Sequence, residues 1–165
     1  MKNRKKGQII IPAGRKPWVH ELRVANILAL NSHKVEFLPE NNEKTPDILL
    51  DGIPYEIKSP ITNKADKLER NIKRGLRQSK NIIFDASRIK NMRDNNLRQF
   101  LINKAKRQKQ IDGLILITKR GQVIDIKSLI WYTAINEVLA QGSMLLPQEL
   151  LFVPSNFAKN PLYKL

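Results

Sequence analysis

The run from Pro46 to Lys58, PDILLDGIPYEIK, constrains the fold of this chain more than any other segment. It contains two short apolar strands joined at Asp51-Gly52, and an Asp-Gly step between two such strands is a strong β-hairpin signal. Because successive side chains of a strand point to opposite faces, Glu56 and Lys58 share one face of the second strand. The sequence therefore predicts a tight hairpin with a charged face.

The hairpin allows two registers, and each brings an acid from the first strand to the charged face. A two-residue turn places Asp47 opposite Glu56. A longer turn, which includes Ile53 and Pro54, places Asp47 opposite Lys58 instead. In both registers two carboxylates gather beside one ammonium group, and like charges that close repel each other. Mg²⁺, which is typically held by one or two carboxylates with water and phosphate oxygens, would remove the conflict. The alternative interpretation is an ordinary hairpin with a solvated charged face.

The bulk composition favours a nucleic-acid partner. The chain has 165 residues, long enough for one domain with a substantial core. Its 30 Lys and Arg against 15 Asp and Glu give a formal net charge of +15, which attracts polyanions. Nucleic acid comes first among these partners and an anionic membrane surface second. No apolar stretch is long enough to span a bilayer, and the absence of Cys excludes disulfides and thiolate metal sites.

Periodicity and boundary residues predict the remaining elements. Helices are expected at residues 17–31, 64–79, 92–109 and 128–140, and strands at 8–11, 34–38, 81–85, 114–118 and 123–126, besides the hairpin. Strands alternating with helices indicate an α/β domain with a mixed central sheet flanked by helices. In the first helix Trp18, Leu22, Ala25 and Leu28 or Ala29 form the predicted apolar stripe, with Glu21 at its edge.

The chain divides into three parts on this pattern. A basic N-terminal arm is expected at residues 1–16 and a core at residues 17–127. Residues 128–165 are expected to form a C-terminal helix and an irregular tail that contains three prolines.

A row of basic residues follows the hairpin on the predicted helix at residues 64–79. Its members recur at helical spacing, away from the apolar stripe: Lys67, Arg70, Arg74 and Arg77. Such a row is often only a solvated face, but few acids interrupt this one and it comes directly after the charged hairpin. We therefore expect it to contact the phosphates of a nucleic acid, with Ser59 as a further phosphate contact.

These features, in this order, resemble the PD-(D/E)xK nuclease superfamily. The resemblance is closer still to the C-terminal nuclease domains of bacterial contact-dependent growth-inhibition toxins, the CdiA-like proteins. The phrases that carry it are His20-Glu21, TPDI at 45–48, YEIKSP at 55–60 and QSKNII at 78–83. The resemblance covers about residues 17–127 and implies that they form a nuclease core of the restriction-endonuclease type.

The resemblance implies a metal-dependent phosphodiester hydrolase. Asp47 and Glu56 are expected to hold Mg²⁺ or Mn²⁺, with the backbone carbonyl of Ile57 as a third oxygen ligand. Lys58 is expected to orient or deprotonate the attacking water and to offset charge on the phosphate. Its place between carboxylates favours the charged form of the amine, and thus a steering role over a base role.

Two more residues receive catalytic roles from the resemblance. Glu21 is expected to reach the site from the first helix, as an outer ligand or as a ligand of a second metal. Gln78 is expected to hydrogen-bond a phosphate or the attacking water. A structural contact at the end of its helix explains Gln78 equally well.

Substrate and partners also follow from the resemblance. The toxin group is similar to transfer-RNA nucleases whose producers carry an immunity protein. This implies a tRNA substrate, with DNA as the alternative, a small acidic immunity protein, and action in the bacterial cytoplasm after delivery from another cell. Such domains usually end a very large secreted protein, whereas this chain begins with Met1, so an excised domain and a free-standing protein both fit it.

Two other functions stay open. The first is a DNA endonuclease of the same fold, such as a restriction-like enzyme or a junction resolvase. The second is a nucleic-acid-binding protein that has kept the fold without catalysis.

Overall fold

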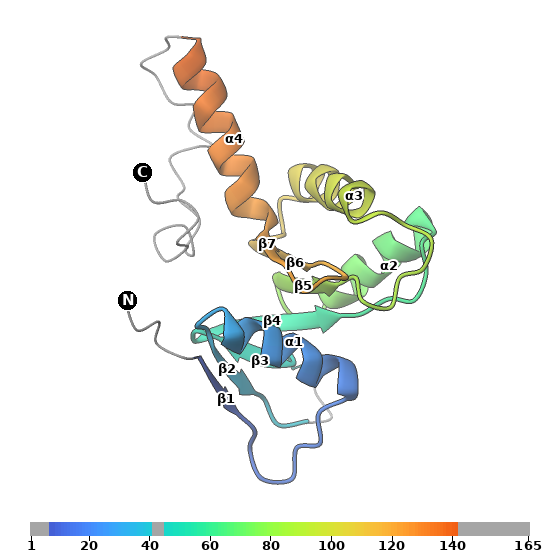
Figure 1. Cartoon of the computed structure of the whole chain (residues 1–165), viewed down its shortest axis with the longest axis vertical. Helices are drawn as coiled ribbons and strands as arrows, with labels where there is room; N and C mark the ends of the chain where they lie inside the picture. Colours follow the sequence, from blue (N-terminus) through green and yellow to red (C-terminus); the bar gives the residue numbers. More distant parts are fainter. Residues whose placement is uncertain (1–6, 41–44, 142–165) are drawn as a thin grey trace.

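The computed structural model describes residues 7–40 and 45–141, which form a seven-stranded mixed sheet with four helices (Figure 1). The elements are β1 (Gln8–Ile10), α1 (Val19–Leu30), β2 (Lys34–Phe37), β3 (Ile48–Leu50), β4 (Ile53–Lys58), α2 (Ala65–Gly75), β5 (Asn81–Asp85), α3 (Asp94–Arg107), β6 (Gly113–Ile117), β7 (Val123–Asp125) and α4 (Ile126–Ala140). The predicted α/β fold with a mixed sheet is confirmed. Residues 1–6 of the predicted arm and the tail from residue 142 lie outside the described residues.

The strands lie in the sheet in the same order as in the sequence. β1 pairs with β2 in parallel, and β2, β3 and β4 form an antiparallel meander. β4, β5 and β6 are parallel, and β7 closes the far edge antiparallel to β6. Parallel neighbours need crossover connections, which α2 and α3 supply. The carboxyl ends of β4, β5 and β6 therefore lie together at one end of the strands, where ligands of α/β sheets usually bind.

The turn between β3 and β4 is the shorter of the two that the sequence allows. Leu50 pairs with Ile53, which leaves only Asp51 and Gly52 in the turn. Their φ values are 50° and 86°, and positive φ at both central residues is what a type I′ hairpin turn requires. This register fixes which residues of β4 face the start of β3.

Two apolar clusters cover the two faces of the sheet. On one face Val24, Ala25 and Leu28 of α1 pack against inward residues of β2 to β6. On the other face Leu68 and Ile72 of α2, together with α3, pack against alternate residues of β5 and β6. β5 and β6 are thus covered on both faces, which accounts for their unbroken apolar sequences and confirms the burial predicted for residues 114–118.

The first helix buries the predicted apolar stripe at Ala25 and Leu28, with Leu22 packed beside it, but differs from the prediction at its start. Trp18 was expected in the apolar stripe, but it precedes the helix and is 66% exposed. Glu21 is buried instead, because its carboxylate accepts hydrogen bonds from the backbone N–H of Trp18 (2.8 Å) and from Arg15 (3.1 Å). An acid at this position of the first turn commonly caps a helix in this way. These contacts satisfy the Glu21 carboxylate in its buried position.

Two further helix boundaries differ from the prediction. α2 ends at Gly75 rather than at Ser79, and the chain then turns toward β5. The expected inward positions of α3, among them Leu97 and Leu101, are buried as predicted. α4 begins at Ile126 and, as Figure 1 shows, extends away from the sheet. In the described part of the chain, no helix has the length and apolar character needed to cross a membrane.

A buried carboxylate ties the ends of the parallel strands to α1. Asp85, the last residue of β5, is completely buried and accepts a hydrogen bond of 2.6 Å from Arg23 of α1. It also accepts hydrogen bonds from the hydroxyls of Ser59 (3.0 Å) and Ser87 (2.7 Å). The guanidinium of Arg23 also donates hydrogen bonds to the backbone carbonyls of Thr118 and Lys119, which follow β6. One side chain thus fixes the segments that leave β4, β5 and β6.

Replacing Asp85 with Ala is expected to lower the free energy of unfolding by about 3 kcal/mol, because it leaves the partly buried guanidinium of Arg23 and two hydroxyls without their acceptor. Urea denaturation of the purified protein measures this loss. The matched control is Asp112→Ala, an exposed acid, which should change stability little. Equal losses in both variants would mean that the Asp85 network does not stabilise the fold.

Candidate functional site

Asp47 and Glu56 lie side by side where the β3–β4 hairpin opens. Ile48 pairs with Tyr55, which is the register of the shorter turn and sets Asp47 next to Glu56, on whose pKa its charge acts. The Asp47 carboxylate accepts a hydrogen bond of 2.7 Å from the backbone N–H of Ile57. This bond anchors the Asp47 side chain against β4 beyond the last strand pair.

Glu56 is buried, with 2% of its surface exposed. One of its carboxylate oxygens, Oε1, accepts a hydrogen bond from the ammonium group of Lys58. The other oxygen, Oε2, is buried and has no hydrogen-bond partner among the described residues. A buried polar atom without a partner is unfavourable, so this oxygen indicates a place where a donor or a cation is needed.

The pKa of Glu56 is raised from 4.5 to about 7. Burial contributes most to the increase and the negative charge of Asp47 comes next, while the hydrogen bond from Lys58 opposes both. Without a cation, the carboxylate pair therefore holds a proton until the pH approaches neutrality. A cation placed between the two acids would remove the repulsion that the proton relieves.

Lys58 lies beneath α2, on the opposite face of the sheet from α1. Tyr55 and Ile57 belong to the apolar cluster with α1, so Glu56 and Lys58 point to the other face. A Cβ atom at Gly75 would lie only 3.3 Å from Cε of Lys58. The missing side chain lets α2 approach the lysine stem closely, which directs the ammonium group toward Glu56.

The oxygen donors at this point suit a divalent cation of the magnesium type. The N–H and C=O of one residue in an antiparallel strand face the same side, so the carbonyl of Ile57 faces Asp47 as its N–H does. Two carboxylates and a carbonyl leave the remaining positions to water and phosphate, as Mg²⁺ prefers. Within residues 7–40 and 45–141, no group of three or more Asp, Glu, His or Cys could hold a metal. The protein ligands of a cation here would be the two carboxylates and the carbonyl.

The structure does not bring Glu21 or Gln78 to the carboxylate pair by any contact that it describes. Glu21 is on α1, which packs against the opposite face of the sheet, and its carboxylate makes the capping contacts described above. Gln78 lies in the turn after α2 rather than on the helix, and its side-chain amide donates to the carbonyl of Thr45 (3.3 Å). This contact is structural, but it joins the turn to the segment before β3 and is not the helix-end contact considered for Gln78. The catalytic roles of both residues stay predictions.

Part of the predicted basic row lines an open pocket next to the hairpin. The pocket has a volume of about 390 Å³ and is lined by Ser59, Pro60, Ile61, Thr62, Lys67, Arg70, Asn71, Arg74 and Arg88. Arg77 is exposed in the turn after α2 and does not line it. Ser59 lines the pocket, but its hydroxyl donates to Asp85. The phosphate contacts expected of the row and of Ser59 stay predictions.

Sequence reasoning missed Arg88 and Asp85. Neither belongs to a motif, and both depend on contacts between distant segments. One signal was present in the sequence of β5, where Asp85 ends an otherwise apolar run. A charged residue at the carboxyl end of a buried strand is a candidate for a polar site at that edge of the sheet.

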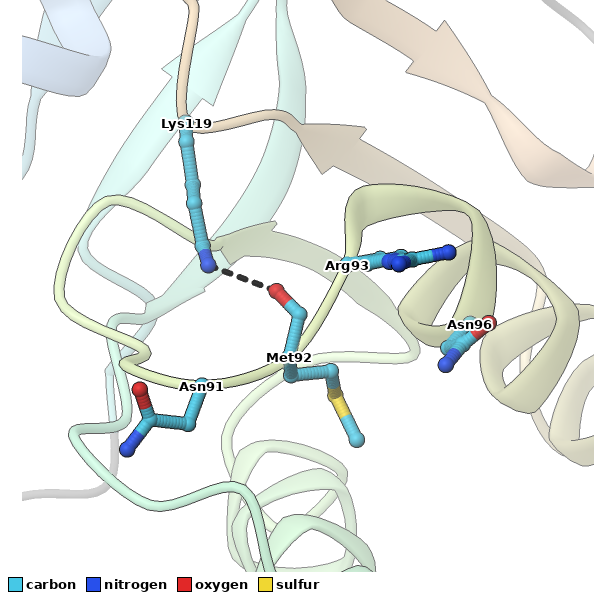
Figure 2. Close-up of a pocket in the computed structure, with 5 residues that line it drawn as sticks. All are labelled: Asn91, Met92, Arg93, Asn96 and Lys119. Carbon is cyan, nitrogen blue, oxygen red and sulfur yellow. Dashed lines mark hydrogen bonds between the residues drawn. The ribbon is translucent and has the colours of Figure 1, made fainter.

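Another pocket lies at the start of α3, with a volume of about 480 Å³. Its lining residues are Asn91, Met92, Arg93, Asn96 and Lys119. Figure 2 shows the ammonium group of Lys119 directed at the backbone carbonyl of Met92, to which it donates a hydrogen bond of 2.6 Å. That cation is therefore already engaged, and no lining residue of this pocket belongs to the carboxylate site.

Comparison with known proteins gives one family match and one similar fold. Residues 44–123, just under half of the chain, match the model of the family described as contact-dependent growth inhibition CdiA C-terminal domain. The matched segment contains both carboxylates, Lys58 and the basic row. For this segment the predicted similarity to CdiA-like domains is confirmed. No curated protein matches the sequence.

A solved structure with a similar fold is described as a CdiA-CT/CdiI toxin and immunity complex from Burkholderia pseudomallei. The TM-score is 0.58 and the sequence identity 16%, over 72% of this chain and 98% of that chain. At this identity the likeness concerns the fold alone.

The raised pKa of Glu56 predicts how stability depends on pH. In chelator, the folded protein should lose stability as the pH rises from about 4.5 to about 7, because Glu56 ionises first in the unfolded chain. Glu56→Gln removes this loss and should be more stable than the wild type by roughly 2–3 kcal/mol above pH 7. Below pH 4.5 the difference should shrink.

Urea denaturation across this pH range measures the effect. Glu36→Gln, which changes a half-exposed acid on β2, is the matched control and should keep the pH profile of the wild type. If the pH profile of Glu56→Gln ran parallel to that of the wild type, the pKa of Glu56 would not be raised by burial and by repulsion from Asp47.

Proposed function

We propose that this chain, whose residues 44–123 match the CdiA C-terminal domain of contact-dependent growth inhibition, is a toxin domain that acts as a metal-dependent nuclease. The main support is the unpartnered Oε2 of Glu56, buried beside Asp47 and paired on its other oxygen with Lys58. Two close acids followed by a lysine two residues later also resemble the PD-(D/E)xK nucleases. A basic pocket next to this cluster supports a polyanionic substrate.

Each residue of the cluster has a distinct role in the proposed reaction. Asp47, Glu56 and the carbonyl of Ile57 hold Mg²⁺ or Mn²⁺, which, when bound, polarises the phosphate and lowers the pKa of a water molecule. Lys58, which contacts Glu56, donates hydrogen bonds to the water or to a phosphate oxygen. Its charge stabilises the negative charge that grows on the phosphate in the transition state.

The substrate is nucleic acid, and we favour transfer RNA. The net charge of +15 and the row of Lys67, Arg70, Arg74 and Arg77 support a polyanion. The step from nucleic acid to tRNA rests on the resemblance to CdiA-like toxin domains, which is an analogy of fold and motif. Gln78, which directly follows Arg77 of the row, remains a candidate for a phosphate contact, and Glu21 a candidate for an outer ligand.

The proposed partner is a small acidic immunity protein, and the proposed place of action is the cytoplasm of a bacterial target cell after delivery from another cell. The similar solved fold is that of a toxin with its immunity protein. A strongly basic toxin offers an acidic inhibitor the same attraction that it offers its substrate, and complementary charge speeds association.

Glu56→Gln and Lys58→Ala should each reduce cleavage by orders of magnitude, because each removes several kcal/mol of transition-state stabilisation and ~1.4 kcal/mol is already tenfold in rate. The assay incubates purified protein with total tRNA and with plasmid DNA, with and without Mg²⁺. EDTA should abolish cleavage in the wild type. Glu36→Gln and Lys34→Ala, which change the same residue types on β2, should cleave as the wild type does.

Near-normal turnover in either variant of the cluster would remove those residues from the mechanism. Full activity in excess EDTA would instead indicate attack by an RNA 2′-hydroxyl group without a metal ion. Binding without cleavage in the wild type would favour the catalytically silent nucleic-acid-binding protein.

Expression of the wild type in a bacterium without the immunity protein should arrest growth and produce specific tRNA fragments, visible on a gel of small RNA. Glu56→Gln should abolish both effects at equal protein levels. Intact tRNA beside degraded chromosomal DNA would refute the RNA substrate and favour a DNA endonuclease of the same fold.

A further inference from the structure

The pocket beside Ser59 has the composition of an anion site. Four of its lining side chains are cationic and none is acidic: Lys67, Arg70, Arg74 and Arg88. Arg70 is partly neutralised by Asp66 at 2.9 Å. Among the described residues, the other three cations have no acidic partner. Cations held together without counter-ions repel one another, and a bound phosphate would relieve that repulsion.

The walls of this pocket are held in place by Asp85. One wall begins at Ser59, whose hydroxyl donates to Asp85, and another carries Arg88, which directly follows Ser87. The backbone N–H of Ser87 also donates to Asp85, at 3.1 Å. The guanidinium of Arg88 in turn donates to the carbonyl of Ser59 at 3.5 Å. Both walls are therefore tied to one completely buried carboxylate, so the pocket exists before a ligand arrives.

The pocket adjoins the carboxylate site on the same side of the sheet. Ser59 directly follows Lys58 at the end of β4. Arg74 directly precedes Gly75, the residue that approaches the stem of Lys58. The pocket thus begins next to the carboxylates and is bordered by the segment after β4 and by the exposed side of α2. Its cationic side chains come from α2 and from Arg88.

We infer that this pocket binds a second phosphate of the substrate strand, next to the phosphate that is cleaved, and that Arg88 and Arg74 are its principal ligands. The inference rests on the proposed nuclease function and adds Arg88, which lies outside the basic row. A guanidinium group can donate two parallel hydrogen bonds to a phosphate. Such a contact is equally strong in the enzyme–substrate complex and in the transition state. It therefore increases affinity and positions the strand but does not change the rate of the chemical step.

The test measures binding of fluorescently labelled total tRNA in the Glu56→Gln background, where cleavage does not interfere. Arg88→Gln and Arg74→Gln should each weaken binding several-fold and reduce the slope of log affinity against log salt by about 0.7–0.9. Arg107→Gln is the matched control, because Arg107 is an exposed arginine at the end of α3 that does not line the pocket. Circular dichroism and thermal unfolding verify that each variant is folded.

Kinetics with an active enzyme separate a positioning role from a catalytic one. Arg88→Gln in the otherwise wild-type protein should raise KM and leave kcat nearly unchanged. Arg88→Lys should recover part of the affinity, because it keeps the charge but not the paired hydrogen bonds. If Arg88→Gln and Arg107→Gln behaved alike while the wild type bound and cleaved RNA, the second phosphate site would be refuted and the nuclease function would stand.

Other outcomes are equally decisive. A wild type that neither binds nor cleaves tRNA or DNA would refute the nuclease function and the phosphate site together. Arg88-dependent binding to vesicles of anionic lipid, without an effect of Arg88→Gln on tRNA binding, would assign the pocket to a membrane surface and overturn the inference.

Discussion

The two-residue turn at Asp51-Gly52 gives the hairpin one register, and that register places two carboxylates opposite each other on the α2 side of the sheet. Among the described residues, Lys58 reaches one oxygen of Glu56 and the backbone N–H of Ile57 one oxygen of Asp47, but neither donor contacts both acids. The turn therefore brings two carboxylates together, and the contacts described offset their repulsion only in part. A like-charge pair that is retained at a cost in stability is a common mark of a functional site.

Chemistry and binding lie on different elements of this structure. The candidate metal ligands and Lys58 belong to a single hairpin, whereas the phosphate-binding side chains come from α2 and from the loop after β5. The two sets of residues meet at Gly75. Because Gly75 has no side chain, α2 packs closely against the stem of Lys58 there. The position of Lys58 thus depends on the packing of the helix that carries the basic row.

The site was predictable where its contacts are local and unpredictable where they are not. Asp47 and Glu56 are connected by turn chemistry and strand alternation, both of which can be read from a few neighbouring residues. Trp18 shows the limit of periodicity, since it precedes the helix and is exposed, whereas Glu21 beside the stripe is buried through capping and an ion pair. The contact between Arg23 and Asp85 joins positions 62 residues apart, and no local pattern reports such a pair.

The strand order of the sheet follows the chain order from β1 to β7, which has a consequence for how the chain folds. Each strand pairs with the strand just before it, and the parallel pairs are separated only by the helix that covers them. The antiparallel pairs join adjacent segments, whereas each parallel pair must wait until the intervening helix is in place, and such non-local pairings form more slowly. A segment that emerges from one end, during synthesis or passage through a narrow channel, finds its partner strand already formed, so the sheet can grow one strand at a time.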